Sequence, residues 1–538
     1  AVRCAPHLLV AASSNAAVES LVEKVQRHKF QDRQGRAYEP WGMVRIGSAA
    51  RGGTEQLRHL DLDSRVEALL SVGRAEVAER QRKVREALSQ LQRKVASLRA
   101  GILKLQGVVP LPSGWEARLA KAPSDRIEFH NHVERRATWQ HPGRPADGDS
   151  GTGLLDLPEA VGRLRDLMQC ADQWWQLNGE ATRLEILFER SESDWDQRDG
   201  RLKERLERSF IGTAHIVFAT LNSAARLRPH MLREGSLPFG TVVVDEAAQA
   251  TEPSTVIPLE LARSRRCVLV GDDRQLPPTM FAGWAEESRA SRTLFERLRQ
   301  LGHTPRLLEE QHRMHPSISA FPRAYFYGGQ LRDADAVVGR EGLALHGLVP
   351  PLLFLDLESS SSESYNGSCR NLEEARLCRG VLEQLLEAAR QLGEESIVRS
   401  VAVLTPYRAQ QEALQLQLRQ SRGAPCGAEA VHTVDGFQGQ EAEVVVFSSV
   451  RAPEVSRRSC GIGFLADERR LNVALTRAKS LLVIIGHSRT LSQSPAWASL
   501  LRHVRGAAPG AGALRRVRSS SEAAAALGGE RPEGCVCS

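Results

Sequence analysis

Two adjacent carboxylates, Asp245 and Glu246, directly follow a run of three valines, Val242 to Val244. This apolar, β-branched run predicts a buried parallel strand, and the acids would lie at its carboxyl end, where parallel sheets bind ligands. In nucleotide hydrolases one acid at this place holds Mg²⁺, and a second acid orients or deprotonates the attacking water. Asp245 is therefore a candidate metal residue and Glu246 a candidate general base. On these residues alone, an ordinary solvated strand end stays an alternative.

Several further apolar runs predict the sheets that would carry these acids. The segments HLLVAA, HIVFAT and RCVLVGDD surround the acidic strand in the first half of the chain, and IVRSVAVLTPY, EVVVFSSV and SLLVIIGH repeat the style after residue 395. Near-continuous apolar runs are typical of parallel strands that are covered on both faces. The sequence therefore predicts an α/β fold with two doubly wound parallel sheets.

Composition limits the class of protein. A chain of 538 residues is too long for one hydrophobic core, and it contains no run of about 18 apolar residues, so no membrane span is expected. Nine cysteines without a C-x-x-C pair argue against a zinc site and favour a reducing compartment, either nucleus or cytoplasm. The formal net charge of +7 is compatible with a nucleic-acid partner and equally with a basic solvated surface.

Five blocks follow the acids in order, and together they carry a family resemblance. They are GDDRQLPPTMF (271–281), QHRMHPSISAFP (311–322), VLTPYRAQ (403–410), VHTVDGFQGQEAEVVVFSSVR (431–451) and RRLNVALTRAKSLLVIIG (469–486). With SSNAAVESL near the start, DEAA itself and NLEEA at 371–375, this set resembles the superfamily 1 helicases of the DEAA-box group, which contains the up-frameshift and senataxin-like helicases. The resemblance covers nearly all of the two predicted sheet domains. It implies two RecA-like domains of the P-loop NTPase type that use ATP and Mg²⁺ to move on single-stranded RNA or DNA.

The resemblance implies a role for each residue of the nucleotide site. Asp245 and Glu246 resemble the Mg²⁺ and water residues, and two glutamines resemble the side chains that sense the γ-phosphate. The remaining matches are two arginines that reach the phosphates from the second domain and a carboxylate that contacts the ribose. These glutamines, arginines and carboxylate are Gln249, Gln275, Arg313, Arg477 and Glu441. Guanidinium groups suit the role because phosphoryl transfer develops negative charge, although each arginine can otherwise be a surface or salt-bridge residue.

The resemblance also implies a path for the nucleic acid across both domains, on the face opposite the nucleotide. The residues in the matching motifs are small, polar or backbone-presenting, which suits a grip on the sugar-phosphate chain without reading of the bases. They are Ser14, Asn15, Thr220, Pro277, Thr405, Pro406 and Thr433.

The phosphate-binding loop that this fold needs does not occur in the sequence. A G-x-x-x-x-G-K-[ST] loop would cradle the phosphates, yet no Gly-Lys pair exists anywhere in the chain. In the family this loop precedes the segment that here begins at residue 8. We therefore expect that the sequence starts inside a longer protein and that this chain alone hydrolyses little ATP. A degenerate relative without ATPase activity is the alternative, but the retained acids, glutamines and arginines argue against it.

Two predicted long helices interrupt the first sheet. Apolar residues from Val84 to Leu105 recur at alternating steps of four and three, which is a heptad seam, and a similar stripe recurs between about 153 and 208. This pattern predicts an antiparallel coiled-coil hairpin, with an ordinary two-helix packing pair as the alternative.

The segment between these helices, residues 111 to 142, resembles a WW domain. Its matching residues include Trp115, Phe129, His132, Trp139 and Pro142. WW domains hold Pro-rich peptides in the polyproline II conformation, so the resemblance implies a Pro-rich protein partner. Glu128 stands where the family has a groove aromatic, so the module can equally be a structural tip without a ligand.

These patterns divide the chain into parts. The predicted parts are a first RecA-like domain at 1–60 and 209–300, a helical hairpin at 61–208 with its WW-like module at 110–143, a second RecA-like domain at 301–505, and a disordered low-complexity tail at 506–538. The function that follows is an ATP-dependent helicase or translocase. The alternative from another class is a non-catalytic nucleic-acid-binding or WW-type adaptor protein.

Overall fold

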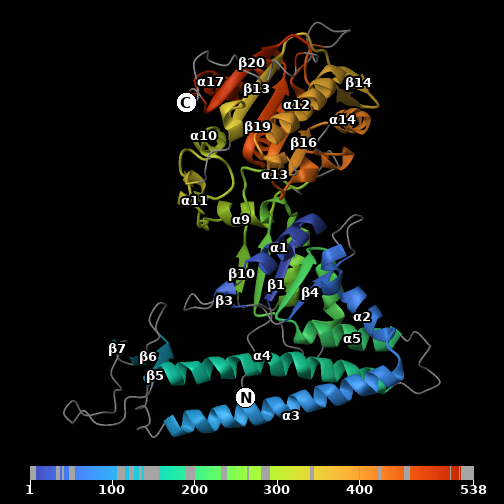
Figure 1. Cartoon of the computed structure of the whole chain (residues 1–538), viewed down its shortest axis with the longest axis vertical. Coiled ribbons are helices and arrows are strands. Elements are labelled where there is room, and N and C mark those ends of the chain that lie inside the picture. Colours follow the sequence, from blue (N-terminus) through green and yellow to red (C-terminus); the bar gives the residue numbers. More distant parts are fainter. Residues whose placement is uncertain are drawn as a thin grey trace. The chain divides into compact units, whose positions relative to one another are not determined.

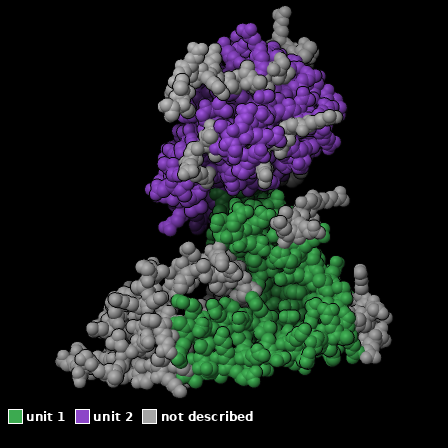
Figure 2. All heavy atoms as spheres, in the orientation of Figure 1, with its two compact units in different colours: residues 1–271 green, residues 272–538 purple. Residues whose placement is uncertain are grey.

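The computed structural model divides into two compact units, residues 1–271 and 272–538, and each is described by itself (Figure 2). The residues that it describes are 8–28, 30–31, 37–38, 42–47, 55–105, 115–119, 127–131, 136–138, 157–189, 200–231, 239–262, 266–279, 291–339, 344–398, 400–421, 426–453, 461–508, 510–519, 522 and 527. This division differs from the predicted boundary near residue 300. Leu276 packs into a core of the second unit, so the segment after Gly271 groups with that unit.

The first unit is built on a five-stranded sheet in the order β10-β9-β1-β8-β4, and all neighbouring strands are parallel (Figure 1). The strands are β1 Leu8–Ala12, β4 Met43–Ile46, β8 Ile216–Thr220, β9 Thr241–Asp245 and β10 Arg266–Leu269. In register, Ala12 of β1 lies beside both Thr220 and Asp245, so the carboxyl ends of the three central strands are level. Side chains at these three ends therefore share one edge of the sheet.

Helices cover this sheet. α1 Asn15–Arg27 packs on the sheet through Val18 and Val22, and α7 Glu252–Ala262 contacts β9 and β1. The other elements of the first unit are η1 Glu55–Leu60, α2 Leu62–Leu70, α5 Gly200–Thr213, η3 Ser223–Leu227, α6 Arg228–Met231, η4 Ala247–Gln249 and the short antiparallel pair β2 Phe30–Gln31 and β3 Ala37–Tyr38.

Two long helices, α3 Arg74–Leu105 and α4 Leu157–Phe188, pack against each other as a hairpin (Figure 1). On α3 the buried residues Val77, Val84 and Leu91 are spaced seven apart, and the polar Gln81 is buried on the same stripe. This spacing keeps one face of α3 turned towards a partner helix.

A three-stranded antiparallel sheet of β5 Trp115–Leu119, β6 Ile127–Asn131 and β7 Arg136–Thr138 lies between α3 and α4 in the chain. The side chains of Trp115 and Phe129, and the residues His132, Trp139 and Pro142 as a whole, lie outside what the structure describes. The peptide-binding role of this WW-like module therefore stays a prediction. None of the helices in the described part of the chain has the length and apolar character to cross a membrane.

The second unit is built on a six-stranded parallel sheet in the order β17-β16-β18-β19-β13-β20. Its strands are β13 Leu352–Leu357, β16 Val401–Thr405, β17 Val431–Thr433, β18 Ala442–Ser448, β19 Ala478–Gly486 and β20 Gly512–Val517. Its main helices are α9 Leu294–Gln300, α10 Pro316–Tyr325, α12 Leu372–Gln391, α14 Arg408–Gln420, α15 Glu468–Leu475 and α17 Pro495–Arg505. Shorter elements are β11 Glu310–Gln311, β12 Arg332–Asp333, α11 Asp335–Val338, β14 Glu363–Tyr365, β15 Ser368–Arg370, α13 Glu395–Val398 and α16 Ser488–Leu491.

Alternating side chains of this sheet fill two hydrophobic cores, one on each face. On β13, Leu352 and Phe354 belong to the core that contains residues of α10, α15 and α17, whereas Leu353 and Leu355 belong to the core with α12 and α14. The same two-residue period holds on β18 and β19. Both faces are therefore buried, and the predicted α/β class with two parallel sheets is confirmed.

The expectation of a disordered tail from residue 506 is wrong for one segment. β20 pairs in parallel with β13 from Gly512 to Val517 and forms an edge of the second sheet. Val517 is buried in the core beneath α12, which anchors a segment that is otherwise rich in Gly and Arg. Pairing with a buried strand thus outweighs the low-complexity composition.

Candidate functional site

β9 delivers the acidic pair to the carboxyl edge of the first sheet. Asp245 is its last residue, and Glu246 follows in the left-handed backbone region, with φ of 53°. Such a backbone is uncommon for a residue with a side chain and concentrates at functional sites. The turn brings the side chain of Gln249 onto the Glu246 carboxylate, to which its amide donates a hydrogen bond of 2.5 Å. The structure thus groups these three candidates.

Burial and close packing define the surroundings of Asp245. Burial raises the pKa of the Asp245 carboxyl, against a hydrogen bond from the Glu246 backbone and the charge of Lys24. Gly271 passes so close behind that a Cβ there would lie 2.8 Å from the Ala248 nitrogen, so only glycine fits. A nearby cation would favour the charged form of this half-buried carboxylate.

The carboxylates at this edge are ligands of a kind that suits Mg²⁺. Among the described residues, no three or more His, Cys, Asp or Glu side chains gather into a metal-binding group. Mg²⁺ uses one or two carboxylates and completes its shell with water and substrate phosphates. Asp245 would therefore be the protein ligand of an ion held together with a nucleotide.

The candidate strand contacts of the first unit lie at the same edge. Ser14 and Asn15 begin α1 directly after β1, and the Ser14 hydroxyl caps that helix by accepting a backbone hydrogen bond of 3.2 Å. Thr220 ends β8, and its hydroxyl donates to the Ser223 hydroxyl at 2.7 Å. A Cβ added at Gly47 would lie 3.4 Å from Asn15 Oδ1 and 3.6 Å from Ser223 Oγ. The ends of β1, β4 and β8 therefore form one small polar surface.

A buried guanidinium lies at the amino edge of the second sheet, directly before β19. Arg477 immediately precedes β19 and is only 2% exposed. It donates to the Gln275 side-chain oxygen at 3.1 Å and to the main-chain oxygens of Val473 at 3.0 Å and Gln440 at 3.3 Å. These acceptors offset the cost of burying the charge and fix the direction of the guanidinium. The structure thus brings Gln275 and Arg477 together.

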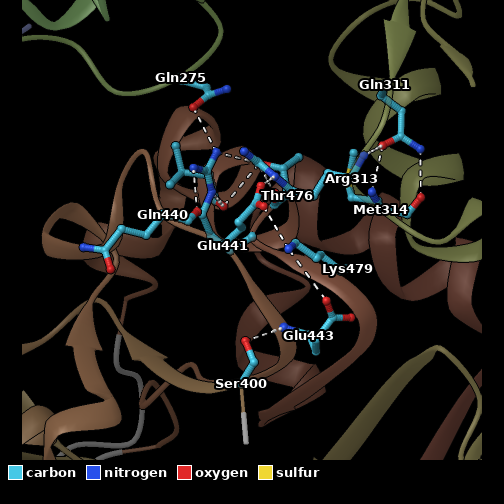
Figure 3. Close-up of polar contacts among 12 residues, drawn as sticks. Gln275, Gln311, Arg313, Met314, Ser400, Gln440, Glu441, Glu443, Thr476 and Lys479 are labelled. Carbon is cyan, nitrogen blue, oxygen red and sulfur yellow. Dashed lines mark hydrogen bonds and ion pairs between the residues drawn. The ribbon is translucent and has the colours of Figure 1, made fainter. Parts of the chain in front are cut away.

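Arg313 and Glu441 form an ion pair at the same edge (Figure 3). Arg313 Nε lies 2.8 Å from one Glu441 oxygen, and Lys479 Nζ lies 2.9 Å from the other. Arg313 also donates to the main-chain oxygen of Thr476 at 2.9 Å. Burial raises the pKa of Glu441, but the Lys479 hydrogen bond and the Arg313 charge outweigh burial and lower the pKa to about 2. Glu441 is therefore ionised at physiological pH and ties Arg313 to the start of β18.

Further polar residues of this edge are not predicted from the sequence. Asp272 accepts hydrogen bonds from the Gln275 amide at 2.9 Å and from the Tyr327 hydroxyl at 2.5 Å, and Asn472 donates to Tyr327 at 2.9 Å. Gln275 is thereby held between Asp272 and a guanidinium. Asp272 and Asn472 stand inside the family blocks, which was the available signal, whereas Tyr327 carried no sequence signal. The ion pair of Lys479 with Glu441, which directly precedes the neighbouring strand β18, likewise cannot be predicted from the sequence.

The strand-contact candidates of the second unit lie at the carboxyl edge of its sheet. Thr405 ends β16 and Thr433 ends β17, and the two strands are parallel neighbours. Thr433 is half-buried, and its hydroxyl accepts a hydrogen bond from the Gly436 amide at 3.1 Å. Thr405 and Pro406 are buried, so their side chains are not presented to a ligand in this structure. Pro277, in the loop that opens the unit, is half-buried.

Comparison with known proteins places this geometry in a family. Two family models described as "AAA domain" match residues 2–283 and 290–489. "Helicase SEN1" of Saccharomyces cerevisiae is 30% identical over 393 residues, 71% of this chain and 17% of that protein. "Probable helicase senataxin" of Mus musculus is 33% identical over 314 residues, 56% of this chain and 11% of that protein. The chain belongs to the Upf1-like group of superfamily 1 helicases.

This helicase chain corresponds to only part of its relatives. "Regulator of nonsense transcripts 1" of Dictyostelium discoideum is 33% identical over 334 residues, 61% of this chain but 24% of that protein. Of the first relatives above, the chain spans 17% and 11%. Among solved structures, an arterivirus nonstructural protein 10 (helicase) covers 52% of this chain and 44% of its own at 16% identity, with a TM-score of 0.26 that is too low to support an argument.

Proposed function

We propose that this helicase chain is the motor part of an ATP-dependent translocase that moves along single-stranded RNA or DNA. One observation carries the proposal: each sheet presents its charged candidates as a built cluster rather than as scattered surface residues. Asp245, Glu246 and Gln249 meet at the end of β9, and Gln275 and Arg477 meet before β19. Phosphoryl transfer needs acids to hold a metal and direct water, and guanidinium groups to stabilise developing negative charge.

The acidic cluster can perform the first half of this chemistry. Asp245 would hold Mg²⁺, which, when bound, neutralises charge on the β- and γ-phosphates. Glu246 would orient the attacking water and accept its proton. The hydrogen bond from Gln249 fixes the Glu246 carboxylate in position. A movement of Gln249 at the γ-phosphate would therefore shift this carboxylate.

The guanidinium cluster can perform the second half. Arg477 is directed by its main-chain acceptors and would stabilise the charge on the transferred phosphoryl group. Gln275 touches this guanidinium directly, so a phosphate that draws Arg477 away would change the contacts of Gln275 with Asp272. Arg313 would bind a phosphate, and the ionised Glu441 beside it would accept a hydrogen bond from a ribose hydroxyl.

The nucleic acid would run over Ser14, Asn15 and Thr220 in the first unit and over the loop at Thr433 in the second. All four are polar and lie at the carboxyl ends of strands, which suits contacts to phosphate and sugar. The Pro-rich partner of the WW-like module belongs to the same proposal, with nucleus or cytoplasm as the place of action. We also propose that the chain alone hydrolyses little ATP, because it contains no Gly-Lys pair to cradle phosphates.

An ATPase assay separates the motor from an adaptor protein that only binds nucleic acid. The natural full-length protein is mixed with ATP, with and without oligouridylate, and we expect hydrolysis that rises when the strand is added. Glu246→Gln should lower the strand-stimulated rate by about a hundredfold or more, since it removes the base. Glu260→Gln on the exposed side of α7 is the matched control and should leave the rate unchanged. Strand binding without any stimulated hydrolysis would favour the adaptor.

A further inference from the structure

The carboxyl edge of the second sheet carries rings and arginines to which the proposed motor assigns no role. We infer that the exposed ring of Phe464, with Arg451 and Arg470 beside it, forms a surface on which the bases of a single strand stack. The inference rests on the proposed function and deepens it, because the contacts named above reach only phosphate and sugar.

Phe464 is the exposed centre of this surface. Its side chain is 53% exposed, which is high for a large aromatic residue. The guanidinium carbon of Arg470 lies 3.9 Å from the ring centroid, and Arg470 is itself oriented by Asp435 at 3.2 Å and Asp467 at 3.0 Å. The ring is thus held on one side by an anchored arginine, while more than half of the side chain is open to solvent. A rigid, accessible ring is what a base needs as a stacking platform.

Arg451 extends the surface beside Phe464, and Tyr407, which is only 8% exposed, supports it from the protein interior. The centroids of the Tyr407 and Phe464 rings are 6.4 Å apart. Arg451 Nε donates to the Tyr407 hydroxyl at 2.8 Å, and its guanidinium carbon lies 5.2 Å from the Tyr407 ring centroid. The same guanidinium lies against Gly463, where a Cβ would come within 2.5 Å of Arg451 Nη2 and where φ is +54°. The left-handed backbone at Gly463 favours glycine, and Arg451 lies against this loop, which also carries Phe464.

A buried carboxyl holds Arg451 in this place through the preceding residue. Val450 has a φ of 72°, a genuine outlier for a β-branched residue. Its amide donates to Glu374 Oε2 at 2.8 Å, and its carbonyl accepts from Asn371 Nδ2 at 3.2 Å. Glu374 is fully buried and also accepts from the Ser448 hydroxyl at 2.6 Å. Strained backbone persists only where the surroundings over-determine it, so this network is a positioning device for Arg451.

The position of the surface identifies its partner. Tyr407 follows β16, Arg451 follows β18, and the Asp435 that anchors Arg470 lies two residues beyond Thr433, the end of β17. These strands are neighbours in the sheet, and Arg470 joins the Phe464 ring to Asp435, so the surface is continuous with the candidate strand contact at Thr433. Rings beside guanidinium groups suit a polyanion that carries stacked bases, and stacking tolerates any base sequence.

Binding of two strands that differ only in their bases tests the inference. The purified 538-residue chain is titrated with a fluorescein-labelled oligouridylate of about twelve nucleotides and with a matched strand in which the bases are replaced by abasic sites. Phe464→Leu keeps apolar bulk but removes the ring, and we expect it to weaken oligouridylate binding by about fivefold or more. Phe464→Trp should retain the affinity, and all three proteins should bind the abasic strand equally.

Control variants give each outcome a meaning. Leu392→Ala removes a side chain that is 38% exposed at the end of α12 and should change neither affinity. The inference is overturned if Phe464→Leu binds oligouridylate as the unchanged chain does, or if it weakens both strands equally. If the unchanged chain binds neither strand, the proposed function itself fails and the inference falls with it. Selective loss of the base-dependent affinity supports the stacking surface.

Discussion

The first sheet gathers its acids and its candidate strand contacts at one edge, whereas the second sheet keeps its guanidinium groups and its candidate strand contacts at opposite edges. In the first unit, Asp245 and Thr220 end the two strands that flank β1. In the second unit, Arg477 precedes β19, whereas Thr433 ends β17. The two sheets share an α/β plan but place their functional side chains in different ways.

This difference determines how a signal would travel in each unit. In the first sheet the two sites are two strand spacings apart sideways, which is about 10 Å. In the second sheet they are separated by the length of a strand such as β18, whose seven residues span about 23 Å. Both faces of the second sheet are buried in separate cores, so its strands can transmit a displacement as rigid rods. We therefore expect the second sheet to carry a displacement along its strands from one edge to the other, and the first sheet to couple two sites that lie at one edge.

The strongest test of this comparison replaces Arg477 by Ala. The role proposed for Arg477 is to stabilise the transferred phosphoryl group alone, so strand-stimulated kcat of the natural full-length protein should fall by about 10³-fold, while the Kd for oligouridylate stays within about twofold. Arg477→Lys keeps the charge but not the planar fork and should give an intermediate loss. Arg489→Ala, on an exposed residue of α16, is the control. An equal loss of rate and strand affinity would show that the two edges are not separate sites.

The next effect concerns the stability of the first unit alone. Arg45 in β4 is 2% exposed, and its guanidinium lies 2.7 Å from Glu19 and 3.0 Å from Asp61. Arg45→Ala leaves two acids without their partner and should cost about 3–5 kcal/mol. Hydrogen exchange should then speed up in β1, β4 and β8 but not in β13, β18 and β19. Arg226→Ala, which breaks an exposed pair with Asp63, should cost about 1 kcal/mol or less.

Exchange that rises equally in both sheets would mean that the two units do not unfold as separate units. In that case the two sheets could not be treated as separate units that transmit a displacement in different ways. Unchanged exchange in both sheets would show that the Arg45 triad contributes little to the first unit.

The smallest expected effect is a pH dependence in the second unit. Burial raises the pKa of Glu374 to about 7, against hydrogen bonds from Ser448 and the Val450 amide. Because the folded-state pKa is raised, this group contributes stability that is complete below its ordinary pKa near 4.5 and is lost as the pH rises through 7. The difference in unfolding free energy between pH 5 and pH 8 should be about 2–3 kcal/mol larger in the unchanged chain than in Glu374→Gln. Urea titrations at both pH values measure it, and identical pH profiles would contradict the assignment.

Much of the fold follows from short-range pattern. The valine run before Asp245 and the similar runs after residue 395 form parallel strands. Continuous apolar segments are typical of such strands because helices bury the side chains on both faces of the sheet. The acids, Gln249 and Arg477 were predicted to take part in one chemistry from the order of their blocks. The contact between Glu246 and Gln249 follows from one block because both residues belong to one turn, whereas the contact between Gln275 and Arg477 joins two blocks that are distant in the chain.

What the sequence does not predict depends on contacts between distant segments. β20 forms in a Gly-rich tail only because β13 offers it an edge. Glu374 is readable as part of the capping pattern that begins α12 at Asn371, but its full burial against Val450 is not. The buried Thr405 likewise lies in a block that predicted a surface contact. Burial of a polar side chain is decided by tertiary packing, which no local pattern encodes.

The central claim is that the acids of the first sheet and the guanidinium groups of the second act on one nucleotide. The most direct measurement is a structure of the natural full-length protein with ADP, aluminium fluoride, Mg²⁺ and a short single strand. The account predicts Asp245 at the metal, with Arg313, Arg477 and Gln275 within about 3 Å of the nucleotide or the phosphate mimic. A bound nucleotide that meets residues of only one sheet, with the other cluster directed elsewhere, would contradict it.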